Sequence, residues 1–150
     1  MKRSLVLFLS FVLVFILGCP VLAAGAGEVI YSDEYFLENG IRVVDTITVY
    51  SNSRANAVST ERDKNLYDGD TLIAHIRFEA AFRYDGSFVS VLYKTVTHTD
   101  TYNGWNYVQN FFTESGGTVT LDAKLTKLLI FNIPFTMTLS CDAEGNISYT

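Results

Sequence analysis

The sequence is poor in the residues that most often carry chemistry. Its 150 residues include two cysteines, two histidines, two prolines and one tryptophan. Two cysteines exclude a scaffold held by several disulfides, and two histidines are too few for a structural zinc site. A glycine-rich phosphate loop, a nucleophile elbow and a His-Glu-x-x-His motif are all absent from the sequence. We therefore expect no cofactor, no metal and no enzymatic activity.

Basic residues are also scarce. There are 11 lysines and arginines against 16 aspartates and glutamates, which gives a formal net charge of −5. Nucleic acids are bound through clustered basic side chains, so this balance argues against a nucleic-acid partner. Hydrophobic residues make up 49% and aromatic residues 14% of the chain, which excludes a disordered protein. The chain is long enough for one domain with a substantial core.

One long apolar run stands at the N-terminus. Two basic residues precede the run, which extends from Leu5 to Leu17, and small residues follow up to Ala26. A basic start, an apolar stretch too short to span a bilayer and a small-residue exit together predict a secretory signal peptide over residues 1–26. The alternative is a lipoprotein signal in which Cys19 is acylated.

An exported protein loses its signal peptide, which changes the charge and the cysteine content of the mature chain. Without residues 1–26, nine bases face the same 16 acids, so the net charge becomes −7. We expect a secreted, extracellular protein that meets a membrane only through the signal segment or a lipid on Cys19. Cys141 then has no disulfide partner. It ends an alternating apolar run that begins at Ile133, which predicts a small buried hydrophobe rather than a nucleophile.

The sequence after residue 26 is patterned as β-strands. Alternate residues are apolar from Leu72 to Tyr84 and again from Thr118 to Leu125, which is the period of a strand with one buried face. Turn dipeptides separate such runs, among them Asp68-Gly69, Asp85-Gly86 and Asn103-Gly104. Strands with one apolar face predict an all-β antiparallel β-sandwich with the general architecture of an immunoglobulin domain. A closed barrel is the alternative.

The predicted sandwich occupies residues 42–150. The acidic segment 27–41 precedes it as an N-terminal arm or a first strand. Within the sandwich, residues 55–66 carry charged and polar side chains on both faces and have no apolar face. Such a segment is typical of an edge strand that is protected from pairing with other chains.

The Asn103-Gly104 turn suggests the best candidate for a binding site. A two-residue hairpin turn there places six side chains on one face of the hairpin, namely Tyr102, Trp105, Tyr107, Asp100, His98 and Gln109. Aromatic rings beside an amide and a carboxylate suit stacking on, and hydrogen bonding to, a sugar or a peptide. The alternative is an aromatic pair that packs inward and fixes the hairpin.

Two further groups of polar residues are weaker candidates. A two-residue turn at Asp85-Gly86 makes His75 and His98 diagonal neighbours on the solvated side of two strands. Such a pair is more often simply exposed to water than bound to a metal. Three aspartates, at positions 63, 68 and 70, cluster around another turn and offer oxygen ligands. Their spacing lacks the alternation of a dedicated calcium loop.

An ordered set of short segments resembles a known family. These segments are Val44–Tyr50, Ser53–Asn56, Phe78–Gly86, Asn103–Trp105 and Thr138–Ser148. In this order they resemble an uncharacterised family of small secreted proteins from Firmicutes, often found in gut Clostridia. The resemblance implies a signal peptide, an all-β domain and export from a Gram-positive cell, and it implies no catalytic residues. This chain is richer in acids and aromatics than the family's lysine-, serine- and threonine-rich members.

Three functions follow from these observations. The first is a non-enzymatic extracellular binding or surface-interaction module whose partner is a cell-envelope or host glycan or a protein. The second is a barrel-like carrier of a small apolar ligand, with phenylalanines at positions 78, 82, 111 and 135 lining its interior. The third is a small hydrolase that uses Asp100 and His98.

Overall fold

The structure is a computed structural model that describes residues 26–52, 56–99, 104–128 and 130–150. These residues form nine β-strands. The strands are β1 (Glu28–Phe36), β2 (Arg42–Asn52), β3 (Ala57–Asp68), β4 (Thr71–Tyr84), β5 (Val89–His98), β6 (Trp105–Ser115), β7 (Thr118–Lys127), β8 (Phe131–Cys141) and β9 (Ile147–Tyr149). Among the described residues, no helix is long and apolar enough to cross a membrane.

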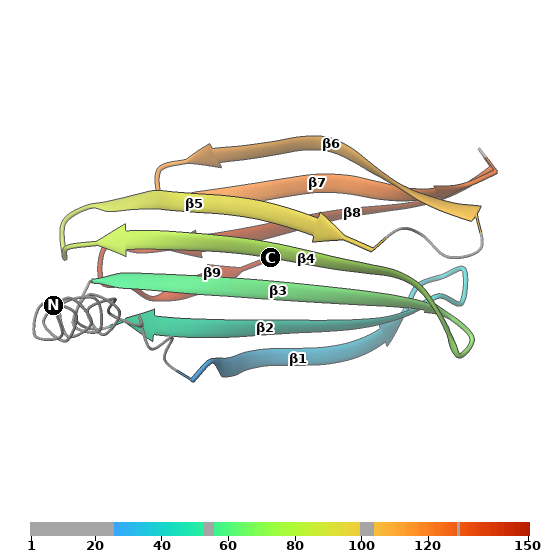
Figure 1. Cartoon of the computed structure of the whole chain (residues 1–150), viewed down its shortest axis with the longest axis horizontal. Helices are drawn as coiled ribbons and strands as arrows, with labels where there is room; N and C mark the ends of the chain where they lie inside the picture. Colours follow the sequence, from blue (N-terminus) through green and yellow to red (C-terminus); the bar gives the residue numbers. More distant parts are fainter. Residues whose placement is uncertain (1–25, 53–55, 100–103, 129) are drawn as a thin grey trace, which may run out of the picture.

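The strands form two antiparallel sheets (Figure 1). The first sheet has the order β1-β2-β3-β4-β5 and the second has the order β6-β7-β8-β9. The predicted all-β sandwich is therefore confirmed. Its two-layer architecture is that of an immunoglobulin domain, but each sheet is an up-and-down meander and only the connection from β5 to β6 passes between the sheets.

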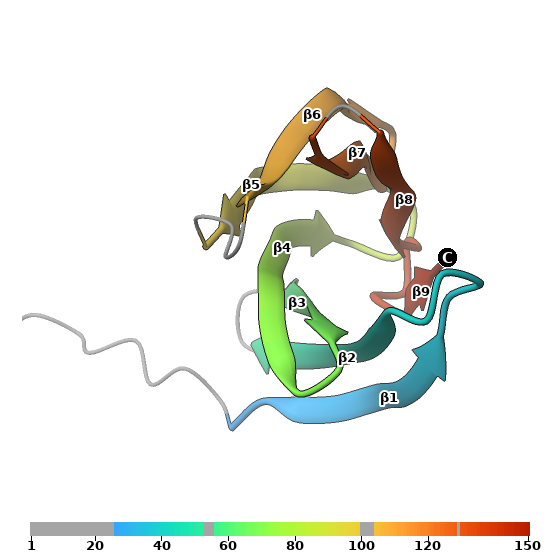
Figure 2. The ribbon, with the colours of Figure 1, turned by 90° about the vertical axis from the view of Figure 1, so that its right-hand side faces the viewer.

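The core lies between the two sheets, which Figure 2 shows in a view along the strands. The strand-period patterns correctly predicted many of its members, including Phe78 and Phe82 from β4 and Leu121 and Leu125 from β7, all of which are fully buried. The predicted inward position of Leu72 is wrong. A register shift beside Tyr67 leaves Leu72 exposed and turns the next residue inward.

The segment from 55 to 66 does not form an edge strand. It forms most of β3, which is the central strand of the five-stranded sheet and is paired on both sides. The charges do not prevent this position because they are compensated locally. Arg62 and Lys64 point inward to Asp45, whereas Glu61 and Asp63 point outward to neighbours on β4. Residues 27–41, the predicted arm or first strand, contain β1, which pairs with β2.

The turn between β4 and β5 is longer than the two-residue turn that the sequence predicts. Tyr84 pairs with Val89, so four residues make the connection. Asp85 closes it by accepting hydrogen bonds from the backbone N–H groups of Ser87 and Phe88, at 3.0 and 2.8 Å. A further register shift beside Phe82 displaces the two strands again. Both changes move the histidines away from their predicted positions.

Candidate functional site: the outer face of the five-stranded sheet

The predicted hairpin around Asn103-Gly104 does not form. β5 belongs to the first sheet and β6 to the second, so the chain crosses between layers where a two-residue turn was expected. The predicted pairing of His98 with Gln109 is therefore absent. Two members of the predicted patch, Asp100 and Tyr102, lie outside the described residues. The turn dipeptide was misleading because glycine suits many tight bends besides hairpin turns.

The described members of that patch divide between the core and the open side of the sandwich. Trp105 is 4% exposed and packs in the core, as the inward-packing alternative predicts. His98 stacks on Tyr107 across the two layers, with ring centroids 4.3 Å apart. The Tyr107 hydroxyl donates a hydrogen bond to Gln109 Oε1 at 3.4 Å. These contacts join the two edge strands, and they give a ligand no access to the indole.

The two histidines do not form a pair. His98 is opposite Ile76 and shares its inward face, whereas His75 contacts Asp63 on the outer face. Among the described residues, no group of three histidines, cysteines or acids is arranged to hold a metal ion. Cys141 is buried, as predicted. Burial, helped by the charge of Asp142, raises the pKa of its thiol to about 11, so the reactive thiolate is suppressed.

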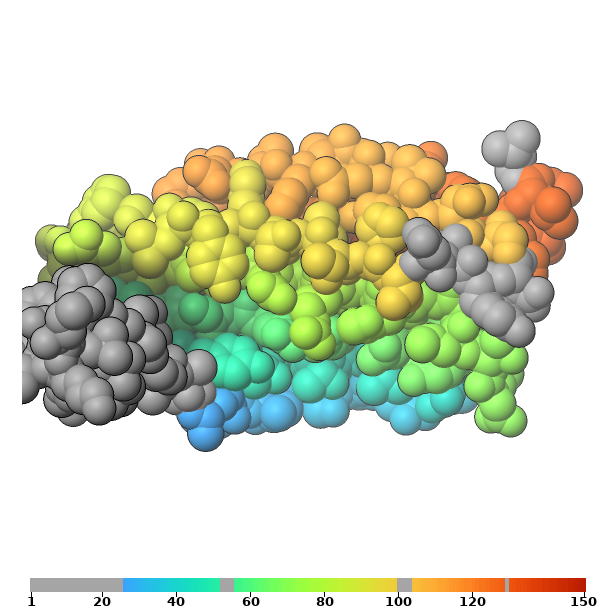
Figure 3. All heavy atoms as spheres, viewed as in Figure 1, coloured from blue at the N-terminus to red at the C-terminus, as the bar shows by residue number. Residues whose placement is uncertain are grey.

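The outer face of the five-stranded sheet carries a group of polar and aromatic side chains that the sequence did not single out. Residues directly opposite in an antiparallel sheet share a face, so the pairing places them in cross-strand rows. Three neighbouring rows are Thr46-Asp63-Arg77-Thr97, Thr48-Glu61-Glu79-Thr95 and Tyr50-Ser59-Ala81-Tyr93. Figure 3 views this face, with β5 in yellow above and β1 in blue below. We call these three rows, together with His75, the outer-face site.

Four titratable side chains in the outer-face site form one connected network. Asp63 accepts hydrogen bonds from Arg77 Nε at 3.0 Å and Nη2 at 3.4 Å, and its Oδ1 lies 2.6 Å from His75 Nε2. Arg77 Nη2 also lies 3.2 Å from Glu61 Oε1. The Glu61 and Asp63 side chains are each 19% exposed. The network is thus open to solvent but held in one arrangement.

The two carboxyl groups of the network differ in their affinity for a proton. Burial, together with the hydrogen bond to Asp63 and its negative charge, raises the pKa of Glu61 to about 7. Burial acts in the same direction on Asp63, but hydrogen bonds from Glu61, Arg77 and His75 outweigh it and lower the pKa of that carboxyl. Of the two carboxyl groups, Glu61 is therefore the one that holds a proton more tightly.

Small and aromatic residues adjoin the acids. Tyr50 and Tyr93 stand at the two ends of one row, with Ser59 and Ala81 between them. Burial and the charge of Glu61 both raise the pKa of Tyr50, which places its ring beside the network. Tyr93 is 48% exposed and offers its ring to a ligand, whereas Ala81 between the two tyrosines is already covered.

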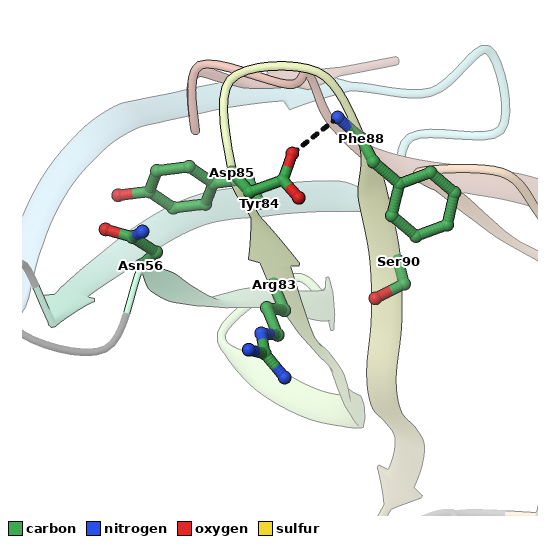
Figure 4. A pocket seen from close by; sticks show the side chains of 6 residues that line it. All are labelled: Asn56, Arg83, Tyr84, Asp85, Phe88 and Ser90. Carbon is green, nitrogen blue, oxygen red and sulfur yellow. Dashed lines mark hydrogen bonds between the residues drawn. The ribbon is translucent and has the colours of Figure 1, made fainter.

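A pocket of about 240 Å³ lies at the end of this face, beside the turn between β4 and β5 (Figure 4). Its lining residues are Asn56, Arg83, Tyr84, Asp85, Phe88 and Ser90. Arg83 and Ser90 are paired across β4 and β5, in the row next to the tyrosines, so the pocket continues the outer-face site. It adds a guanidinium, an amide and a hydroxyl, which are the donors that oxygen-rich ligands require.

The inner face of the same sheet carries a second charged group, which we call the inner cluster. Asp45 is 1% exposed and accepts hydrogen bonds from Arg62 Nε at 3.0 Å, Arg62 Nη2 at 2.8 Å and Lys64 Nζ at 2.7 Å. Burial raises the pKa of Asp45, but the Arg62 hydrogen bond and the Lys64 charge more than offset it, and the net shift is downward. Arg62 also donates to the Thr150 carbonyl and Lys64 to the Tyr35 hydroxyl. The inner cluster therefore stabilises the contact between the layers and is closed to a ligand.

No family model, no curated protein and no solved structure matches this chain. The resemblance to small secreted proteins of Firmicutes therefore stays a prediction, and the residues of the outer-face site are the basis for inferring function.

Proposed function

We propose that the protein is a non-enzymatic extracellular binding module that recognises a glycan on the outer-face site. The observation that carries this proposal is the solvent-open network of Glu61, Asp63, His75 and Arg77. Carboxylate and guanidinium groups in a fixed arrangement suit neighbouring hydroxyl groups, which donate and accept at the same time. The signal peptide expected over residues 1–26 supports a location where glycans are available.

The residues around the network also favour a sugar. Threonines flank the acids in both charged rows, and the tyrosine row adjoins them. Aromatic faces stack on the apolar face of a sugar ring, while nearby hydroxyl and carboxyl groups bind its edges. A protein partner would more commonly bury a larger apolar centre, which this face lacks.

Hydrolysis at the same carboxyl pair is the second candidate. A protonated Glu61 beside an ionised Asp63 resembles the acid and base of a glycosidase, whose environments displace the two pKa values in opposite directions. Glycosidases, however, hold their two carboxyl groups about 5 to 9.5 Å apart, with the scissile bond between them. The Arg77 guanidinium bridges Glu61 and Asp63, so it takes the place that a scissile bond would need. Binding is the better proposal.

The carrier is the least favoured function. Phe78 and Phe82 are fully buried in a core that both sheets fill, and Phe111 is exposed on the outside of β6. An apolar ligand would have to displace packed side chains rather than enter a preformed cavity.

The test is a glycan array that includes soluble peptidoglycan fragments and host mucin-type oligosaccharides, followed by calorimetric titration of each hit. We expect binding that the double variant Glu61→Gln/Asp63→Asn weakens by about 1.4 to 3 kcal/mol, at least tenfold. Glu144→Gln is the control for the loss of an acid elsewhere on the surface, because Glu144 is exposed in the turn before β9. The proposal fails if no glycan binds, or if the control loses as much affinity as the double variant.

A further inference from the structure

One end of the sandwich presents apolar side chains to solvent. Leu128, Ile130 and Phe131, at the turn between β7 and β8, are 73%, 79% and 54% exposed. We call these three residues the apolar tip. Figure 1 shows this turn at the right-hand end of the molecule, extending beyond the neighbouring strands. These side chains lie mostly in solvent, so the fold gains little from them.

The backbone of the apolar tip is also unfavourable for its sequence. Leu128 has a φ of 54°, in the left-handed region that glycine and asparagine tolerate and branched side chains avoid. Among the described residues, the other positive-φ positions are six glycines and Asn56. Leu128 therefore adds backbone strain without adding packing. A residue with an unfavourable backbone conformation and no compensating contact indicates a role other than stabilising the fold.

Other exposed apolar side chains lie at the same end. Phe36 ends β1 and Leu72 begins β4, and both are exposed. Because the strands of each sheet run antiparallel, these two positions and the turn between β7 and β8 reach the same end of the sandwich (Figure 1). Five exposed apolar side chains thus lie at this end of the sandwich.

We propose that the apolar tip inserts into the surface of a lipid bilayer. A convex tip needs a matching pocket to bind a protein, whereas bilayer lipids rearrange around it. Lys127 stands directly before the tip, with its ammonium 5.7 Å from the Trp105 ring. A lysine beside an inserted apolar tip can reach the lipid phosphates. Glu38 and Asp70 lie in other turns at this end, so the combined charge favours zwitterionic over anionic lipids. Docking in this way leaves the outer-face site free.

The experiment uses the full chain with a tryptophan placed at either end. Phe131→Trp puts an indole at the apolar tip, and Phe88→Trp puts one at the opposite end, where Phe88 is also exposed. Each variant is mixed with phosphatidylcholine vesicles, with or without brominated acyl chains that quench nearby indoles. We expect the emission of Phe131→Trp to be roughly twofold lower with brominated than with unbrominated vesicles. The emission of Phe88→Trp, and that of the wild type, which reports the buried Trp105 alone, should be the same with both kinds of vesicle.

A second variant separates docking from folding. Adding Leu128→Asn and Ile130→Ser to Phe131→Trp removes two apolar groups and relieves the backbone strain. We expect the quenching to disappear while the melting temperature is unchanged or higher. Equal quenching at both ends, or none at the tip, would overturn the proposal. So would a dimer in gel filtration that the Leu128 and Ile130 changes dissociate, since a second copy would then cover the tip.

Discussion

The central strand β3 carries charged side chains on both of its faces, and these side chains have different partners and different exposure to solvent on the two faces. On the inner face, one carboxylate, Asp45, receives three hydrogen bonds from Arg62 and Lys64 in a dry environment. On the outer face, two carboxyl groups, Glu61 and Asp63, share one guanidinium and one imidazole in contact with solvent. The inner acid is fully compensated, whereas Glu61 in the outer pair holds a proton more tightly than usual, because its pKa is raised. We infer that the inner cluster serves the fold and the outer-face site serves binding.

The largest expected effect comes from breaking the inner cluster. Asp45→Ala leaves Arg62 and Lys64 buried without their carboxylate. We expect the free energy of unfolding to fall by about 3–5 kcal/mol, because two desolvated cations lose their partner. Urea denaturation measures this loss. Asp68→Ala, which removes an exposed acid from the end of the neighbouring strand β3, is the control and should change the stability by less than about 1 kcal/mol.

A companion variant tests whether the charges themselves are needed. Replacing the whole inner cluster with apolar residues, as in Asp45→Leu/Arg62→Met/Lys64→Leu, removes the unpaired charges along with the pairs. We expect stability near or above that of the wild type, because desolvating an ion pair offsets much of its attraction. A triple variant as unstable as Asp45→Ala would show that the hydrogen bonds to Tyr35 and Thr150 matter more than the charge balance.

The outer pair of carboxyl groups, Glu61 and Asp63, should have an intermediate effect on stability, and this effect depends on pH. The pKa of Glu61 is about 7 in the folded chain against an ordinary value of 4.5. The folded chain therefore holds a proton that the unfolded chain has released, so this stabilisation is complete below pH 4.5 and is lost as the pH rises through 7. We expect the free energy of unfolding to fall across this window by on the order of 1–3 kcal/mol.

The variant Glu61→Gln tests whether Glu61 causes this dependence of stability on pH. The amide cannot ionise, so the variant should show a flatter dependence on pH and exceed the wild type in stability above pH 7. Denaturation by urea across the window gives both curves. Asp45 and Asp63 do not mask the effect, because their lowered pKa values move their own contributions below 3.8. Parallel curves for the two proteins would contradict the assignment of the raised pKa to Glu61.

The smallest expected effect comes from the guanidinium of the outer-face site. The Arg77 side chain is 40% exposed, so water screens its pairs with Asp63 and Glu61. Arg77→Gln should lower the free energy of unfolding by less than about 1 kcal/mol, while any glycan affinity falls with that of the acid variants. A loss of stability as large as that of Asp45→Ala would contradict the inference that the inner cluster serves the fold and the outer-face site serves binding.

Most of the fold could be predicted from the sequence, because alternation along a strand is a local property. The runs ending at Leu125 and Cys141 show which side chains face inward without any knowledge of their partners. The outer-face site could not be predicted, because it is created by strand pairing and not by a local pattern. In β3, charge occupies both faces, so the period of two that identifies a buried strand is hidden, and the segment was assigned to an edge. The signal that was available is the length of this uninterrupted polar run between two predicted strands.

The predicted patch around Trp105 is wrong because it depended on one assumed strand register. It depended on a hairpin turn before Trp105, and the chain instead passes to the other sheet at that point. A change in register of a single residue reverses the face of every side chain, so one turn dipeptide is too little to fix a site. The alternative is correct only in the inward position of Trp105, because the hairpin that the aromatic pair was to fix is absent and Tyr102 lies outside the described residues.

The sequence alone determined the strands, the two-sheet architecture and most of the apolar core, because these follow from the spacing of side chains along each strand. The position of β3 at the centre of its sheet was decided only by the tertiary structure. So were the burial of Arg62 and Lys64 against Asp45 and the meeting of Glu61, Asp63, His75 and Arg77 on the outer face. The physical reason is that the state of a charged side chain depends on its partners, and strand pairing brings those partners from distant parts of the chain.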